Sequence, residues 1–200
     1  MPAKNRDLHG NVPDKSPVAL VLIDVINDFE FDGGDKLLKH ALPVARRIAA
    51  LKAKALERRI PVIYANDNFG RWRSDFQQVV AHCLTDGVRG QSIAEILKPG
   101  AEEYFVLKPK HSAFYSTTMD LLLHYLEAKR VVLAGFTGDM CVLSTAADAY
   151  LRDLQINVPA DCVASQSAVE NRKALQYIGR VFKADTRSSK AVDLARLRRA

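Results

Sequence analysis

The sequence predicts one α/β domain: a three-layer, doubly wound (Rossmann-like), mostly parallel sheet with helices on both faces. The chain has 200 residues, enough for a single domain with a substantial core. Short apolar runs alternate with longer segments of helical period, which is the pattern of repeated strand–helix–strand units. The apolar runs are continuous and rich in β-branched residues, as in strands that a parallel sheet buries on both sides.

Five apolar runs are the expected strands. The first, at 18–23, is a six-residue stretch without a polar side chain. A run of this length without helical period is typical of a buried strand. The others, in chain order, lie at 60–65, 104–107, 131–134 and 156–160, and a last edge strand is expected at 181–184.

The apolar spacing between these runs predicts helices. The longest covers 36–59, with Pro43 near the first turn of its main part. Another is expected to begin after Asp139, as its N-cap, and to end near Leu154. Shorter helices are expected at 77–83, 92–97, 118–128 and 167–177, with a small amphipathic piece at 192–197.

The composition is that of a soluble globular protein, with 48% apolar and 26% charged residues. Residues 1–16 are expected to form a flexible arm, 17–187 the folded domain and 188–200 a basic tail. The arm lacks the apolar segment of a secretory signal, and no run approaches the roughly 20 residues of a membrane span. Three cysteines, an odd number, suit a reducing compartment. We therefore expect a cytoplasmic protein with no membrane partner.

The formal net charge of +6 raises the question of a nucleic-acid partner. The basic residues lie mainly on one expected helix, between 46 and 59, and in the tail, between 196 and 199. No nucleic-acid-binding motif accompanies them, so a solvated helix face is the simpler interpretation. We expect no nucleic-acid partner.

Polar residues follow several of the expected strands. Asp24 comes directly after the first strand, Asp67 follows the second, and Lys108 follows the third. The carboxyl ends of parallel strands share one edge of a sheet, where α/β folds place their ligand crevice. An acid and an amine can therefore meet there, although a cap on the next turn is an equally simple interpretation of Asp24.

Cys141 stands apart from the other two cysteines. It follows the fourth strand and a glycine-containing turn, where a helix is expected to begin. A helix N-terminus offers N–H groups and a partial positive charge, which favour a thiolate and a developing oxyanion. Cys83 and Cys162 lack this setting and are expected to be packing residues.

Three segments together resemble a known family. They are Leu-Ile-Asp24-Val-Ile-Asn-Asp-Phe, Lys108-Pro-Lys-His-Ser-Ala-Phe and Gly-Phe-Thr-Gly-Asp-Met-Cys141-Val. In this order, each at a strand end, they resemble motifs of the isochorismatase-like cysteine hydrolase superfamily, which includes nicotinamidases and N-carbamoylsarcosine amidohydrolases. The segment 158–165 resembles that family's next strand, so the resemblance covers about 18–177.

The resemblance implies a catalytic triad of Asp24, Lys108 and Cys141. Asp24 would act as the general base, and Lys108 would hold the acid and the thiol by its charge. Cys141 would attack a carbonyl carbon and form a thioester. Lys110, two residues beyond Lys108, is the alternative lysine and is expected instead at the surface or at a substrate.

The same resemblance implies an oxyanion hole made by the backbone N–H groups of Thr137 and Cys141. It also implies a cis peptide bond just before this hole, between Phe136 and Thr137. A non-proline cis bond costs about 3 kcal/mol and is rare.

The sequence departs from the nicotinamidase pattern where that group binds a metal. Nicotinamidases carry an Asp-x-His pair after the second strand, whereas this chain has Asp67-Asn68-Phe69. The five histidines do not form a ligand cluster by spacing. We therefore expect no catalytic metal and no cofactor.

Residues near the strand ends are candidates for the pocket wall. Asp67 either lines a metal-free pocket or anchors its own loop. The aromatic candidates belong either to the pocket or to the core. The full set of pocket candidates is Phe29, Asn66, Asp67, Trp72, Phe114 and Phe136.

The leading hypothesis is a cysteine hydrolase that cleaves a C–N bond of a small amide or carbamoyl compound. Two alternatives remain: a hydrolase of another bond in the same pocket, and a non-catalytic binding or assembly member of the family. The complete Asp24–Lys108–Cys141 set argues against the second alternative. The resemblance also implies a homo-oligomer, a dimer or a tetramer.

Overall fold

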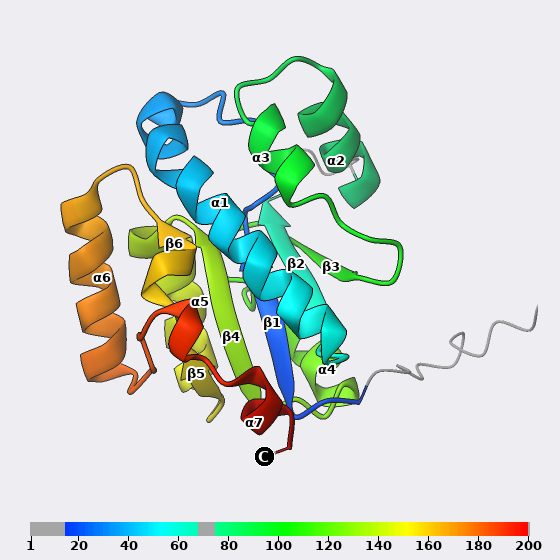
Figure 1. The fold of residues 1–200 in the computed structure, drawn as a ribbon, viewed down its shortest axis with the longest axis vertical. Helices are drawn as coiled ribbons and strands as arrows, with labels where there is room; N and C mark the ends of the chain where they lie inside the picture. The colour runs from blue at the N-terminus through cyan, green and yellow to red at the C-terminus, as the bar shows by residue number, and fades with distance from the viewer. Residues whose placement is uncertain (1–14, 68–74, 200) are drawn as a thin grey trace, which may run out of the picture.

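The fold is a parallel β-sheet between two layers of helices, as the sequence predicts (Figure 1). The computed structural model describes residues 15–67 and 75–199. Its six-stranded sheet has the order β3-β2-β1-β4-β5, and β6 also pairs with β4. The strands are β1 (Val18–Ile23), β2 (Val62–Asp67), β3 (Tyr104–Lys108), β4 (Arg130–Phe136), β5 (Gln155–Asn157) and β6 (Val163–Ala164).

The central strand β1 explains why the fold has two cores. Every one of its residues is buried, because helices cover the sheet on both sides. Successive side chains of a strand point to opposite faces. Leu20 and Leu22 accordingly belong to one apolar cluster, and Val21 and Ile23 to the other.

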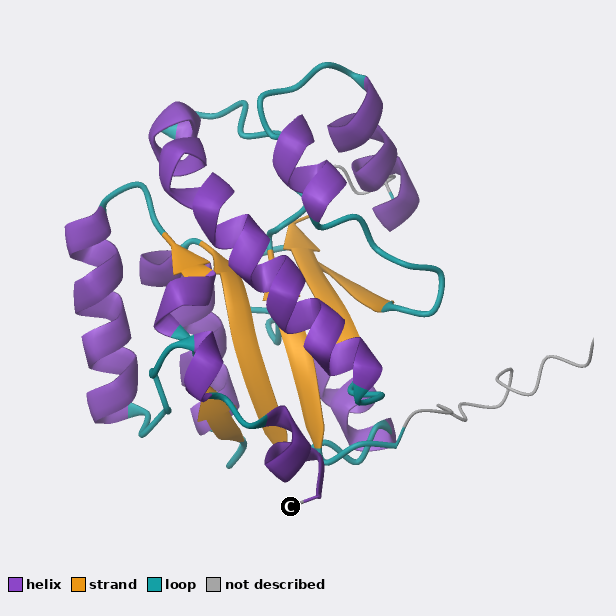
Figure 2. Cartoon of the chain, viewed as in Figure 1, coloured by secondary structure: helices purple, strands orange, loops and turns teal. Residues whose placement is uncertain are grey.

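The helices divide between the two faces of the sheet (Figure 2). The first face is covered by α1 (Gly34–Glu57), α2 (Phe76–Thr85), α3 (Gln91–Ile96) and α7 (Leu194–Arg199). The second is covered by α4 (Met119–Tyr125), α5 (Leu143–Tyr150) and α6 (Ala168–Val181). Short helical turns complete the described chain: η1 (Gly138–Val142), η2 (Ala160–Cys162) and η3 (Ser189–Ala191). None of the helices in these ranges is long and apolar enough to cross a membrane.

Helix α1 begins earlier than Pro43, so the prediction that proline marks its first turn is wrong. The helix starts at Gly34 and carries Pro43 in its interior. A proline there removes one main-chain hydrogen bond. Pro43 lies on the exposed side of the helix, where water can hydrate the carbonyl that loses its partner.

The ends of several other elements also differ from prediction. The second strand is shifted to β2, so that Asn66 and Asp67 belong to the strand and not to the loop after it. The predicted strand at 156–160 ends at Asn157, before Pro159, and the chain resumes pairing in β6. The predicted edge strand at 181–184 is wrong, since α6 continues to Val181 and only a single bridge joins Asn157 to Asp185.

The helix after β4 differs at both ends from the prediction. It begins as the π-helical turn η1, whose preceding residue is Thr137, so Asp139 lies inside the turn and is not its N-cap. The regular helix α5 ends at Tyr150, four residues before the predicted end at Leu154. A residue with positive φ, Asp153, follows this end and turns the chain towards β5.

The strand order reverses between β1 and β4. The chain runs outward through β1, β2 and β3, then crosses to β4 and continues to β5 on the other side. In open α/β sheets, the crevice at the carboxyl ends of the strands at such a reversal is the usual ligand site. Here that crevice lies between Asp24, after β1, and the turn that follows β4.

Gly135 allows β1 and β4 to approach closely at this edge. It pairs with Ile23 and has φ +126°, a region that residues with a side chain avoid. A Cβ atom at this position would lie 2.1 Å from the carbonyl oxygen of Ile23. Because backbone and not a flexible side chain stands in the way, the strands would have to move apart.

We therefore predict that Gly135→Ala destabilises the fold by about 3 kcal/mol, the sum of backbone strain and overpacking. Gly87→Ala is the matched control: Gly87 also has positive φ, but no atom of the described residues lies within 4 Å of the point that its Cβ would occupy. Its expected loss is about 1 kcal/mol. Urea unfolding curves of the two variants test this, and equal losses would contradict the steric explanation.

Candidate active site

Three side chains from separate strand ends meet at the carboxyl edge of the sheet. Asp24 follows β1, Lys108 is the last residue of β3, and Cys141 lies in η1 after β4. Asp24 and Cys141 flank the reversal of strand order. The backbone of Lys108, in β3, lies two strands away from β1. Its long side chain covers this distance to reach Asp24.

The backbone holds Asp24 at the end of β1. Asp24 has φ 51°, in the left-handed region of backbone conformation, so the chain leaves the extended strand conformation at this residue. Its N–H donates to the carbonyl of Ala65 at 2.9 Å, and its Oδ1 accepts from the N–H of Asp67 at 2.8 Å. These two bonds fasten the carboxylate to the end of β2.

Lys108 connects the acid to the thiol. Its side chain is fully buried, and its Nζ lies 2.8 Å from Oδ2 of Asp24 and 3.7 Å from Sγ of Cys141. The same ammonium donates to the carbonyl oxygen of Lys110 at 3.1 Å. The side chain that reaches Asp24 is therefore that of Lys108, while Lys110 is exposed.

Cys141 lies in the first turn of η1 and is only partly buried. Helical N–H groups in a first turn lack carbonyl partners within the helix. The backbone N–H of Thr137 acts to lower the pKa of the Cys141 thiol. The peptide bond between Phe136 and Thr137 is cis, the form that the resemblance implies for it.

The charges around the site perturb all three groups. Burial raises the pKa of Asp24, and the nearby Lys108 reduces this effect without cancelling it. Burial works to lower the pKa of Lys108, but its charged neighbours, Asp24 foremost, outweigh this effect and the pKa is raised. Lys108 therefore stays protonated at neutral pH, and Asp24 is a better proton acceptor than an ordinary carboxylate.

The Cys141 thiol is neutral in the resting site. Burial, and then the charge of Asp24, raise its pKa to about 12, while Lys108 and the Thr137 N–H act in the opposite direction. The sequence pattern favours a thiolate at a helix start, but desolvation and the neighbouring carboxylate are stronger here. A base is therefore needed to convert this thiol to a thiolate, and Asp24 is the carboxylate whose charge acts on it.

The other two cysteines are core residues. Cys83 and Cys162 are fully buried in the cluster beneath α1 and α2. Burial raises the pKa of both thiols to about 12. Within the described residues, neither has a lysine near its sulfur as Cys141 has, so both fit the expected packing role.

A hollow of about 580 Å³ opens at Cys141. Asp24, Asp67 and Phe136 line it, so two of the expected pocket residues are in place. Phe29 and Phe114 instead belong to the two apolar cores, and Asn66 is fully buried with its amide donating to the carbonyl of Ile26. Trp72 lies outside the described residues.

Sequence reasoning missed several residues of this wall. They come from the turn after β1, from η1 and from the start of α6: Asn27, Phe31, Met140, Gln166, Ser167 and Glu170. The last three follow β6, which pairs with β4 at Phe136 and Ala164. The polar residues after β6 were the available signal, because every parallel strand here ends at the same edge.

His111 was also missed as a site residue. Its Nδ1 lies 3.8 Å from Sγ of Cys141, although its side chain is exposed. It stands three residues after Lys108, within the same motif, and that spacing was the signal available in the sequence.

No metal-binding group is evident in the described part of the chain. Within residues 15–67 and 75–199, no three His, Cys, Asp or Glu side chains lie together in a way that could hold an ion. Asp67 lines the hollow beside Asp24, and its backbone N–H is bound to that residue.

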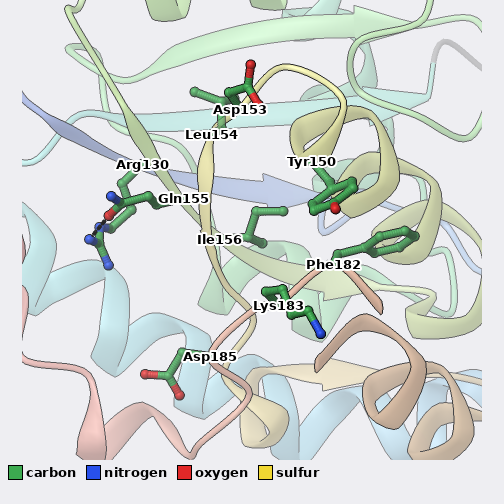
Figure 3. A pocket seen from close by; sticks show the side chains of 9 residues that line it. All are labelled: Arg130, Tyr150, Asp153, Leu154, Gln155, Ile156, Phe182, Lys183 and Asp185. Atoms are coloured by element: carbon green, nitrogen blue, oxygen red, sulfur yellow. Dashed lines mark hydrogen bonds between the residues drawn. The ribbon is translucent and has the colours of Figure 1, made fainter. Parts of the chain in front are cut away.

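A second hollow, of about 410 Å³, lies at the opposite end of the sheet (Figure 3). Arg130 and Gln155, the first residues of β4 and β5, line it together with the adjoining rings of Tyr150 and Phe182. None of its lining residues is a Cys, Ser, Thr or His. The hollow at Cys141 is therefore the better candidate for covalent chemistry.

Comparison with known proteins gives the family. The isochorismatase domain model matches residues 18–188. Over 171 residues the chain is 39% identical to the isochorismatase family protein YaaI of Bacillus subtilis strain 168, covering 86% of this chain and 93% of YaaI.

Solved structures agree with this assignment. The chain is similar to N-carbamoylsarcosine amidase from Thermoplasma acidophilum, with a TM-score of 0.68, 26% identity and coverage of 88% of this chain and 98% of that one. It is also similar to the pyrazinamidase/nicotinamidase of Streptococcus mutans UA159, with a TM-score of 0.67, 29% identity and coverage of 84% and 99%. The family model, the sequence relative and the folds lead to one conclusion: the chain belongs to the isochorismatase family of hydrolases.

Proposed function

We propose that this protein is a cysteine hydrolase that cleaves the C–N bond of a small amide or carbamoyl compound through a thioester, with Asp24, Lys108 and Cys141 as its catalytic triad. One observation carries the proposal: a buried ammonium lies within reach of both a carboxylate and a half-buried thiol, at the opening of a hollow. Relatives named as an amidase and a nicotinamidase support C–N hydrolysis.

Acylation begins with the thiol. Asp24 accepts the proton of Cys141, the sulfur forms a bond to the substrate carbonyl carbon, and the carbonyl π pair moves onto oxygen. The ammonium of Lys108, 3.7 Å from Sγ, stabilises the sulfur while it carries negative charge. Because the resting thiol has a pKa of about 12, this transfer occurs only with a base in contact.

The backbone at the start of η1 stabilises the oxyanion. Thr137 directly precedes η1 and Cys141 is in its first turn, where N–H groups lack helical carbonyl partners, so these two N–H groups are the proposed donors to the oxyanion. The carbonyl of Thr137 accepts from the N–H of Val142 at 3.0 Å, which fixes the orientation of this peptide unit.

Collapse of the tetrahedral intermediate breaks the C–N bond. Asp24 returns its proton to the departing nitrogen, and ammonia or an amine leaves. The acyl group remains on Cys141 as a thioester until water hydrolyses it and restores the thiol.

The first prediction concerns the nucleophile. Cys141→Ala is expected to reduce ammonia release from small amides at least about 10³-fold, since the thioester cannot form. Cys83→Ala is the matched control, because its thiol is fully buried away from the hollow. A panel of carboxamides, carbamoyl and ureido compounds is assayed for ammonia, with hydroxylamine added to capture the thioester as a hydroxamate. Equal activity of Cys141→Ala and the wild type would overturn the proposal.

The second prediction concerns the two partners of the thiol. Asp24 raises the pKa of Cys141 and Lys108 lowers it, so Asp24→Asn should increase the thiolate fraction near pH 8 and Lys108→Met should decrease it. One pKa unit changes that fraction on the order of tenfold, and iodoacetamide alkylation at Cys141 should change accordingly. Both variants should nevertheless lose hydrolysis.

Peptide mapping distinguishes the alkylated cysteines, and thermal melts verify that each variant is folded. Cys83 and Cys162 serve as internal controls, because both are 0% exposed. Slower alkylation in Asp24→Asn together with faster alkylation in Lys108→Met would contradict the assigned charges.

A further inference from the structure

We propose that His111 is a further catalytic residue: the base that activates water for hydrolysis of the Cys141 thioester. The inference rests on the proposed function and adds a residue to it. It follows from the position of one imidazole at the nucleophile, from the way its loop is fastened, and from the burial of Asp24.

His111 touches the reacting atom. Its Nδ1 lies 3.8 Å from Sγ of Cys141, and the ring is exposed. A thioester carbonyl carbon is bonded directly to that sulfur. A base at this separation can therefore reach it through one water molecule, hydrogen-bonded to the imidazole and in contact with the carbon.

Asp24 is less open to water than His111. Its side chain is almost completely buried, whereas that of His111 is exposed. Oδ1 of Asp24 accepts from the N–H of Asp67, and Oδ2 faces the ammonium of Lys108. Water from solvent reaches the imidazole directly. We therefore assign the second proton transfer to His111, while Asp24 serves the thiol.

Two contacts fix the loop on either side of His111. On one side, the Lys108 ammonium holds the carbonyl of Lys110, which belongs to the peptide unit joining Lys110 to His111. On the other, the hydroxyl of Thr145 accepts from the N–H of Ala113 at 3.1 Å.

The Thr145 hydroxyl has a second role. It donates to the carbonyl oxygen of Cys141 at 2.7 Å, so one side chain holds both the nucleophile and the histidine loop. The neighbouring Ser112 is buried and donates to Asp148 on α5. His111 is thus an exposed residue on a segment whose neighbours are anchored, which is the setting of a positioned functional group and not of a free surface side chain.

Hydrolysis of the thioester moves one proton from water to His111 and then to sulfur. Neutral His111, with its proton on Nε2, accepts one proton from water at Nδ1 while the water oxygen bonds to the thioester carbon and the π pair moves onto the carbonyl oxygen. The re-formed carbonyl then expels sulfur with the electron pair of the C–S bond. The imidazolium returns the proton to Sγ, and the acyl group leaves as a carboxylic acid.

Burst kinetics with p-nitrophenyl acetate test this assignment. The ester acylates a reactive cysteine and releases p-nitrophenolate, so the burst reports acylation and the steady state reports deacylation. In His111→Ala and His111→Gln, the burst amplitude is expected to be unchanged and the steady-state rate to fall about 10²-fold, the usual contribution of a general base. Acetylated Cys141 should accumulate, as seen by intact-protein and peptide mass spectrometry.

Chemical rescue separates catalysis from structure. Imidazole added to His111→Ala should restore deacylation, which it cannot do if the ring only supports the loop. His124→Gln is the control, since His124 is an exposed histidine on α4 whose ring contacts Tyr125. A wild-type steady-state rate in His111→Ala, or a loss that imidazole does not restore, overturns the inference and leaves the triad intact. A burst that persists in Cys141→Ala instead overturns the proposed function itself.

Discussion

The buried ion pair between Asp24 and Lys108 is the interaction on which the site depends. It joins the ends of β1 and β3, two strands that are not neighbours in the sheet. The distance from Nζ of Lys108 to Oδ2 of Asp24 is 2.8 Å. Removing charges from water is costly, and each charge here is tolerable only because the other stands beside it. The pair therefore fixes the carboxylate and the ammonium relative to each other, and both relative to the sulfur. Desolvation, which makes the pair costly, also keeps the thiol neutral and makes Asp24 a stronger base.

The sheet and its carboxyl edge were predictable because the relevant signals are local. An apolar run such as 18–23 predicts a buried strand from its own residues alone. The carboxyl ends of parallel strands lie at the same edge of the sheet. The predicted ends of helices and strands were wrong where the surroundings of a segment, and not its own residues, determine its structure. Pro43 is accommodated inside α1 because one side of that helix faces water. The segment after Asn157 breaks at Pro159 and pairs again only as β6, whose partner β4 lies more than 20 residues earlier.

Asp24, Lys108 and Cys141 were predictable as candidate site residues, but the geometry that joins them was not. The motif spacing identifies Lys108 as a candidate, yet only the folded sheet shows that its side chain must cross β2 to reach Asp24. The location of the aromatic residues is harder still to predict, because pocket walls and cores contain the same apolar residue types. Phe29 and Phe114 fill the two cores, while Phe136 belongs to the same core as Phe29 and also lines the hollow. His111 was overlooked since an isolated histidine has no periodic pattern, and its contact is with a residue 30 positions away in the sequence.

The start of α6 contributes to the hollow at Cys141 but not to the chemistry within it. Gln166, Ser167 and Glu170 line the hollow, and none of them contacts Asp24 or Lys108 in the hydrogen-bond and ion-pair network of the described residues. Ser167 caps the helix through the N–H of Glu170, so the segment is held by its own helix and not by the triad. On the proposed function, substitutions among these three side chains would change which small molecule fits the hollow, while the contacts between Asp24, Lys108 and Cys141 remain. Selectivity and reactivity would then be encoded in separate parts of the chain.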